Sequence, residues 1–216
     1  MKPAPTHTVK ILLADDHAIV RRGVRQLLAE SWPAAVFGEA TTAQQALEQV
    51  WKETWSIVLL DITMPGRSGL DIIRELKDAQ PKMPVLVLSM HAEEQFALRM
   101  LKSGASGYVT KDTLLEDLTR AVDKVLAGGR YLSGTLAELL AGVLAGADQV
   151  PHERLSDREF QVMLLLARGM ALKEIGAQLA LSVNTISTYR LRMLEKMNMR
   201  SNADLVQYSI LHGLIE

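Results

Sequence analysis

Residues 57–66 have the sequence Ile57-Val58-Leu59-Leu60-Asp61-Ile62-Thr63-Met64-Pro65-Gly66. The apolar run at its start predicts a short strand that is buried on both faces, with Asp61 at its carboxyl end. Parallel α/β sheets place their sites at the carboxyl ends of strands, so we expect the groups that follow such runs to meet in one crevice. Three further runs also end in polar or charged groups: 9–14 before Asp15-Asp16, 84–88 before Ser89, and 107–110 before Lys111.

Segments of helical period alternate with the strands up to about residue 128. Five strand–helix units in a row predict an α/β fold with a doubly wound, five-stranded parallel sheet. A flavodoxin-like strand order would place the crevice beside the first and third strands, which end in Asp15-Asp16 and Asp61. The expected pairs are 9–14 with 19–30, 35–39 with 43–51, 57–60 with 70–79, 85–88 with 93–102, and 108–109 with 114–127.

The composition is that of a globular protein. The chain has 216 residues, of which 48% are hydrophobic and 23% charged, enough for one large or two ordinary domains. The absence of cysteine excludes disulfides, thiolate zinc sites and cysteine nucleophiles. We find no signal-peptide pattern and no apolar run that could span a bilayer, so we expect a cytoplasmic protein with no membrane partner. The net charge of −1 does not decide whether nucleic acid binds.

The second part of the chain predicts helices only. We expect a disordered tail at 1–8, a first domain at 9–130, a linker with a short helix (134–146) at 131–153, and an all-α domain of four helices at 154–216. Ser156 followed by Glu159 indicates a capping box at the start of the first of these helices. The helices are expected from 156 to 169, from 171 to 180, from 182 to 198, and from 201 or 202 to 213.

The residues of the crevice suit phosphoryl transfer. An ionised aspartate such as Asp61 is a competent nucleophile, and attack on an anionic phosphoryl group needs neutralising cations. Mg²⁺ prefers hard oxygen ligands, which Asp16 and Asp61 would offer directly, Asp15 through water, and Thr63 through its backbone carbonyl. Lys111 would pair with one phosphoryl oxygen, and the Ser89 hydroxyl would donate to another.

Each of these residues also has a purely structural explanation. Asp15-Asp16 are suitable helix-cap and loop residues, and Asp61 suits a turn before Pro65-Gly66. Ser89 could cap the following helix, and Lys111 could be a solvated surface lysine. Their conjunction at successive strand ends favours a phosphorylation site.

Residues 9 to about 128 resemble the receiver domain of bacterial two-component response regulators. The resemblance implies that Asp61 accepts a phosphoryl group from a histidine kinase, that Mg²⁺ binds at Asp15, Asp16 and Asp61, and that Ser89 and Tyr108 form a switch pair. Asp112 stands where many receivers have proline, which excludes a cis-proline there. The matching motifs are Asp15-Asp16, Asp61 with Met64-Pro65-Gly66 and Gly69, Ser89, Gly104-Ala105 before Gly107-Tyr108, and Lys111.

Residues 155 to about 210 resemble the LuxR-type helix-turn-helix. With the receiver, this makes the chain similar to regulators of the NarL/FixJ family. The resemblance implies a scaffold helix at 171–180, a turn at 181–183 and a recognition helix at 184–198. The matching residues are Leu155-Ser156-Asp157-Arg158-Glu159, Gly169, Lys173-Glu174-Ile175, Ala177, Leu179, Ser182 and Thr185.

The expected recognition helix is amphipathic. Its apolar stripe consists of Ile186, Tyr189, Met193, Leu194 and Met197. The opposite face and its flanks would approach base edges in the major groove; the expected contacts are Asn184, Thr185, Ser187, Thr188, Leu191 and Arg192. Lys173, Lys196 and Arg200 are better suited to DNA phosphates.

Two features of this helix depart from the pattern expected of a recognition helix. Relatives often have lysine where Ser187 stands, and some have another where Leu191 stands, which argues against guanine contacts from these positions. Leu191 would contact a thymine methyl instead. Arg190 lies close to the apolar stripe, so its guanidinium must extend to a phosphate or a neighbouring acid.

These observations predict a DNA-binding transcriptional regulator switched by phosphorylation. The expected partners are a histidine kinase, promoter DNA and a second copy of the chain, with RNA polymerase as a further candidate. Phosphorylation would draw Ser89 inward, let Tyr108 rotate, and reshape the face around 93–102.

Two alternatives to this function remain open. One is a receiver with a protein-binding α domain. The other is a Mg²⁺-dependent phosphohydrolase with an aspartyl-phosphate intermediate, although Thr63 stands where such an enzyme needs a second carboxylate.

Overall fold

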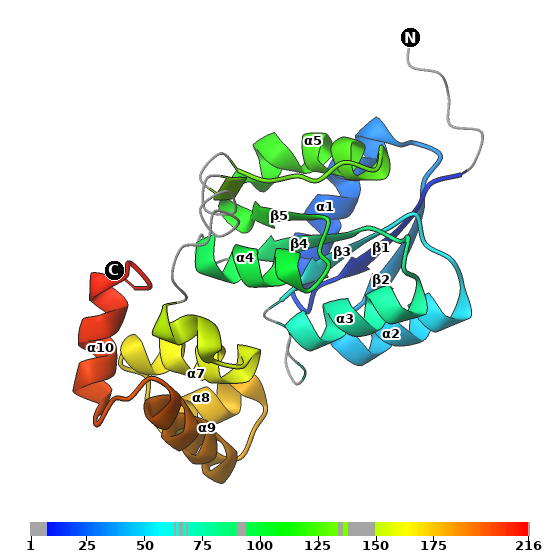
Figure 1. Ribbon diagram of the computed structural model, residues 1–216. Coiled ribbons are helices and arrows are strands. Elements are labelled where there is room, and N and C mark those ends of the chain that lie inside the picture. The colour runs from blue at the N-terminus through cyan, green and yellow to red at the C-terminus, as the bar shows by residue number, and fades with distance from the viewer. Residues whose placement is uncertain are drawn as a thin grey trace. The chain divides into compact units, whose positions relative to one another are not determined.

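The structure is a computed structural model that describes residues 8–62, 64, 67, 69–89, 94–133, 136–137 and 150–215. The chain divides into two compact units, Met1–Ala141 and Gly142–Glu216, which we describe separately (Figure 1). Within the described ranges, no helix has the length and apolar character needed to cross a membrane.

The first unit is a five-stranded parallel sheet between two layers of helices, as predicted. The strand order is β2-β1-β3-β4-β5, which is the flavodoxin-like order. The strands are β1 (Lys10–Ala14), β2 (Val36–Ala40), β3 (Ile57–Asp61), β4 (Val85–Ser89) and β5 (Gly107–Thr110). The helices are α1 (Ala18–Ser31), α2 (Ala43–Lys52), α3 (Gly69–Ala79), α4 (Glu94–Lys102) and α5 (Leu114–Leu126), with a 3-10 turn, η1, at Lys111–Thr113.

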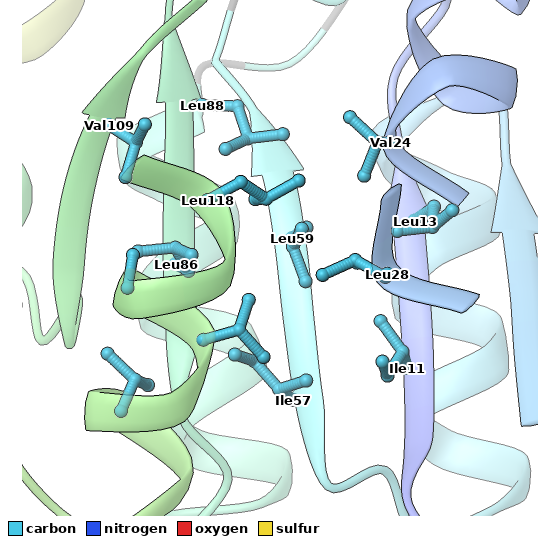
Figure 2. Packing of buried hydrophobic residues seen from close by; sticks show 13 residues of the cluster. Ile11, Leu13, Val24, Leu28, Ile57, Leu59, Leu86, Leu88, Val109 and Leu118 are labelled. Atoms are coloured by element: carbon cyan, nitrogen blue, oxygen red, sulfur yellow. The ribbon is translucent and has the colours of Figure 1, made fainter. Parts of the chain in front are cut away.

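One face of the sheet is covered by α1 and α5, as Figure 2 shows. Alternate residues of the strands point into this layer, because successive side chains of a strand face opposite sides. Leu59 of β3 lies at its centre, between Leu28 of α1 and Leu118 of α5 (Figure 2). The intervening residues of the same strands, such as Leu12, Val58 and Leu60, are also fully buried. Burial on both faces explains why the strands are continuous apolar runs.

Residues 150–215, the described part of the second unit, contain four α helices, as predicted. They are α7 (Asp157–Ala167), α8 (Leu172–Leu179), α9 (Val183–Lys196) and α10 (Asn202–Leu211). The Ser156 side chain accepts a hydrogen bond from the Glu159 amide, and the Glu159 side chain accepts one from the Ser156 amide, so the predicted capping box is confirmed. The Ser201 side chain caps α10 in the same way, through Asp204.

Two short features lie at the ends of the segment between the domains. Tyr131 forms a parallel bridge with Gly107, so the edge of the sheet continues one residue beyond the boundary expected at 130. Pro151–Arg154 form a 3-10 turn, η2, where a linker was expected, and proline favours such a start because it lacks an amide hydrogen. The tail at 1–7, the helix predicted at 134–146 apart from 136–137, and Thr63 lie outside the described residues.

Candidate functional site

Three strands bring two carboxylates and an ammonium group to one edge of the sheet. Asp15 follows β1, Asp61 ends β3, and Lys111 follows β5. The Lys111 Nζ atom lies 2.7 Å from Asp15 Oδ2 and 2.7 Å from Asp61 Oδ2. Asp61 is fully buried, and the Asp15 and Lys111 side chains are each only 5% exposed. Residues far apart in the sequence therefore form one charged cluster in the crevice predicted for them.

The carboxylates of Asp15 and Asp61 stabilise the protonated form of Lys111. Burial on its own lowers the pKa of this lysine, but the hydrogen bonds and negative charges of Asp15 and Asp61 outweigh burial and raise the pKa above its usual range. Lys111 is therefore protonated at neutral pH. The lysine neutralises part of the negative charge of a buried acidic pair, which would be costly to bury unpaired.

Asp16 and His17 complete this cluster on the loop after β1. Ligand atoms of Asp15, Asp16, His17 and Asp61 all lie within 4.8 Å of one another. His17 Nδ1 lies 2.9 Å from Asp16 Oδ1, and the His17 amide donates to Asp15 Oδ1 at 2.7 Å. Sequence reasoning missed His17, although its position directly after Asp15-Asp16 was a signal. The three carboxylates supply the hard oxygen donors that Mg²⁺ prefers, so the donor set fits this ion.

The remaining predicted crevice residues lie on the last two strands. Ser89 is fully buried at the end of β4, where it stands beside Thr110 of β5. Tyr108 is buried in β5 and precedes Val109, which belongs to the hydrophobic layer on the side of α5. Because neighbours on a strand face opposite sides, Tyr108 faces the layer that contains α4.

In the second unit, α8 and α9 are joined by a tight turn. Ala180 ends α8 in the left-handed conformation with φ of 53°, and the Leu181 amide donates to the Gly176 carbonyl at 2.8 Å. Ser182 then caps α9 by accepting a hydrogen bond from the Thr185 amide. Gly176 was not among the residues singled out from the sequence, yet an added Cβ there would lie 2.8 Å from the Leu181 carbonyl oxygen. The close approach of the turn therefore requires glycine.

The two faces of α9 are divided nearly as predicted. Ile186, Met193, Leu194 and Met197 of the apolar stripe are buried, whereas Tyr189 is half-buried. Asn184, Thr188, Leu191 and Arg192 are exposed along the other face, and Thr185 and Ser187 are half-buried. The Thr185 hydroxyl also lies 2.8 Å from the Ser182 hydroxyl, within the helix cap.

The cations of the second unit have different surroundings. Lys173 and Arg200 are exposed. Lys196 donates instead to the buried carboxylate of Glu159 on α7, at 2.6 Å. The Arg190 guanidinium donates to the Asn202 side-chain oxygen at 2.7 Å, so the protein group that it meets is an amide and not an acid. The sequence pattern foresaw neither pair, because each joins side chains of two different helices, Lys196 of α9 to Glu159 of α7 and Arg190 of α9 to Asn202 of α10.

An acidic crevice with a buried aspartate and lysine on a flavodoxin-like sheet, followed by a helix-turn-helix, defines a two-component response regulator. Residues 11–123 match the family model described as "Response regulator receiver domain". Residues 153–209 match that of "Bacterial regulatory proteins, luxR family". The chain belongs to the NarL/FixJ family of response regulators.

Curated relatives match along nearly the whole chain. Response regulator GacA of Pseudomonas aeruginosa is 35% identical over 210 residues, which are 96% of this chain and 98% of the relative. Response regulator UvrY of Escherichia coli is 32% identical over 208 residues, 95% of each chain. These relatives are named as regulators rather than as enzymes.

Solved structures of Salmonella typhimurium RcsB share the arrangement of elements. One, described by its conformational dynamism for DNA interaction, is 26% identical with a TM-score of 0.68, covering 94% of this chain and 97% of that one. Another shows RcsB bound to promoter rprA in the presence of phosphomimetic BeF3−; it is 26% identical with a TM-score of 0.65, covering 94% and 98%.

Proposed function

We propose that this protein is a transcriptional regulator whose binding to promoter DNA is controlled by phosphorylation of Asp61. The observation that carries the proposal is the cluster of Asp15, Asp61 and Lys111 at the strand ends, in a chain that also holds a helix-turn-helix. The DNA-bound RcsB structure supports the same link between a phosphoryl mimic and promoter DNA in a relative of similar architecture.

Asp61 is the proposed phosphoacceptor. A carboxylate oxygen attacks the phosphorus of a phosphohistidine on a sensor kinase, so that a P–O bond forms while the P–N bond breaks and the imidazole takes up a proton. Lys111 already lies 2.7 Å from Asp61 Oδ2, where it can pair with an oxygen of the incoming group. The Ser89 hydroxyl, at the end of the neighbouring strand, is the proposed donor to another phosphoryl oxygen.

Asp15, Asp16 and Asp61, with the backbone carbonyl of Thr63, are the proposed ligands of Mg²⁺. The bound ion supplies positive charge that lets an anionic phosphoryl group approach an anionic nucleophile. The proximity of the three carboxylates, within 4.8 Å through one atom each, supports this assignment.

The proposed switch connects Ser89 to α4. When the Ser89 hydroxyl binds the phosphoryl group, Tyr108 rotates into the space that this movement opens, and the surface around 93–102 changes. The burial of both residues supports the proposal, because a buried tyrosine can move only where a neighbour makes room.

The proposed DNA interface is the exposed face of α9. Asn184, Thr185, Ser187, Thr188, Leu191 and Arg192 are the proposed contacts to base edges, and Lys173, Lys196 and Arg200 the proposed contacts to phosphates. The protein would act as a homodimer, because one short recognition helix contacts too few bases for specificity. A solved structure of two RcsB dimers bound to two parallel DNAs supports this for a relative.

The test is phosphorylation of the Asp61→Asn variant. An amide is not a competent nucleophile, so acetyl phosphate and Mg²⁺ should label the wild type at Asp61 and leave the variant unlabelled, as followed by mass spectrometry. Treatment should also tighten promoter binding by the wild type only. The matched control is Asp112→Asn, which changes an exposed aspartate next to Lys111 and should be labelled normally. Equal labelling of the Asp61→Asn variant would refute the proposal.

A further inference from the structure

The side chain of Arg21, in the first turn of α1, connects two parts of the receiver. Its Nη1 atom donates to the Asp15 backbone carbonyl at 2.7 Å, and its Nε atom donates to Glu39 Oε2 of β2 at 3.2 Å. The Arg21 side chain is only 12% exposed. A guanidinium with so little exposure loses much of its hydration, and these two acceptors replace it.

Glu39 anchors this guanidinium. It lies on the edge strand β2, opposite Leu13 in the register of β1. The hydrogen bond from Arg21 is the main cause that lowers the pKa of Glu39 below its usual range, with Arg25 contributing at 3.1 Å. Glu39 is therefore ionised at neutral pH. Arg25 is 54% exposed; its guanidinium pairs with Glu39 and lies over the Phe37 ring, 5.6 Å from the ring centroid.

The contact with Asp15 fixes a particular peptide plane. The Asp15 carbonyl and the Asp16 amide belong to one planar unit, so holding the oxygen also sets the direction in which the chain continues to Asp16. The Asp15 amide is held on its other side by the Ala40 carbonyl at 3.1 Å. The backbone of Asp15 is thus anchored to β2 twice, once directly and once through Arg21 and Glu39.

We propose that Arg21 is a positioning residue for the metal-binding loop, which holds the peptide between Asp15 and Asp16 so that both carboxylates face Asp61. The role rests on the proposed function of the crevice. Arg21 donates to the Asp15 backbone and to Glu39, so it acts through the loop that carries the proposed Mg²⁺ ligands. Outer partners that orient metal ligands commonly change metal affinity about 10-fold to 100-fold when they are removed.

The primary test measures the dissociation constant of Mg²⁺ by isothermal titration calorimetry on the full chain. Arg21→Met keeps the apolar stem but removes both hydrogen bonds, and it should raise the dissociation constant roughly 10-fold. The matched control is Arg25→Met, which removes the other arginine partner of Glu39 and leaves the Asp15 contact intact. Its Mg²⁺ affinity should equal that of the wild type.

A second readout separates positioning from a general effect on the fold. The initial rate of labelling by acetyl phosphate should need more Mg²⁺ in Arg21→Met but reach nearly the wild-type rate at saturation, because Asp61 and Lys111 are unchanged. A lysine at position 21 can reach only one of the two acceptors, so Arg21→Lys should show a smaller rise in the dissociation constant. If Arg21→Met does not fold by circular dichroism, Arg21→Lys decides the question.

The outcomes distinguish this inference from the proposed function. Labelling of the wild type at Asp61 together with unchanged Mg²⁺ affinity in both Arg21 variants overturns the role of Arg21 alone. Equal losses of affinity in Arg21→Met and Arg25→Met would mean that the arginines only join α1 to β2, which also overturns it. A wild type that neither binds Mg²⁺ nor becomes labelled overturns the phosphoacceptor function, and the role of Arg21 with it.

Discussion

Glu159 combines two tasks in one side chain. Its Oε2 atom accepts hydrogen bonds from the Ser156 amide at 2.7 Å and from Lys196 Nζ at 2.6 Å. Burial on its own raises the pKa of this carboxyl, but the hydrogen bonds from Lys196 and Ser156 outweigh it and lower the pKa below the ordinary 4.5. Glu159 therefore both caps α7 and joins α7 to α9.

The lowered pKa of Glu159 predicts a specific acid sensitivity. A group whose pKa is lower in the folded state contributes stability above its unfolded pKa and loses it as the pH falls through the folded value. Protection of α7 and α9 from hydrogen exchange should therefore fall below about pH 4.5 in the wild type. In Glu159→Gln the same decline should be shallower. Identical pH profiles for the two proteins would contradict this role.

Lys196 has a structural role in addition to its proposed contact with DNA. Lys196→Ala leaves the Glu159 carboxylate buried without its cation and should destabilise the second unit by about 1–2 kcal/mol, less than a fully buried pair would cost, since the Lys196 side chain is 42% exposed. Hydrogen exchange of the α7 peptides measures this loss. Arg200→Ala is the control, because this exposed side chain acts on Asp204 only through its charge at the surface, so its removal should leave the stability of the second unit nearly unchanged.

At the scale of elements, the turn between α8 and α9 depends on one glycine. Gly176→Ala places a methyl group 2.8 Å from the Leu181 carbonyl oxygen, and backbone must shift to accommodate it. The expected cost is about 1–3 kcal/mol of stability in the second unit, with weaker DNA binding. Hydrogen exchange of α8 and α9 measures the first effect, and titration of a promoter duplex the second.

The control for this substitution is another helical glycine, in α1. Gly23 has nothing within 4 Å of an added Cβ, so Gly23→Ala should stabilise the receiver by about 0.5–1 kcal/mol, because alanine is the better helix former. Fluorescence of the three tryptophans, Trp32, Trp51 and Trp55, which all belong to the receiver, is one way to follow that unit as it unfolds. If both substitutions had effects of the same sign, steric crowding would not explain the requirement for Gly176.

The elements themselves were predictable because their signals are local. Apolar runs gave the five strands to within one or two residues, and Ser156 with Glu159 gave the start of α7. The positions of Asp15, Asp61 and Lys111 at one edge followed from the parallel topology. The contacts of Arg21 with Asp15, Lys196 with Glu159, and Arg190 with Asn202 were not predictable, because a long flexible cation carries no sequence signal for which acceptor it meets.

For the whole molecule, the division between base and phosphate contacts makes a testable contrast. Arg200→Ala should weaken binding to all duplexes alike and reduce the slope of log K against log salt by about one unit, because one fewer counterion is released. Asn184→Ala and Arg192→Ala should cost roughly 1–3 kcal/mol on the specific site and much less on random DNA. Titrations across a salt series on specific and scrambled duplexes measure both effects. Equal losses of affinity for the specific and the scrambled duplex in Asn184→Ala and Arg192→Ala would contradict the proposed recognition face.

The bridge between Gly107 and Tyr131 has a consequence for dividing the chain into fragments. The Tyr108 amide donates to the Tyr131 carbonyl at 3.2 Å, and the Tyr131 amide donates to the Ser106 carbonyl at 3.1 Å. A receiver fragment cut after residue 130 would leave these groups on the outer edge of β5 without partners. Open strand edges recruit other strands, so this fragment should self-associate, whereas one that ends at 133 should stay monodisperse in light scattering without phosphorylation. Residues 131–133 would then cover the exposed edge of β5 and prevent edge-to-edge pairing between two receiver fragments.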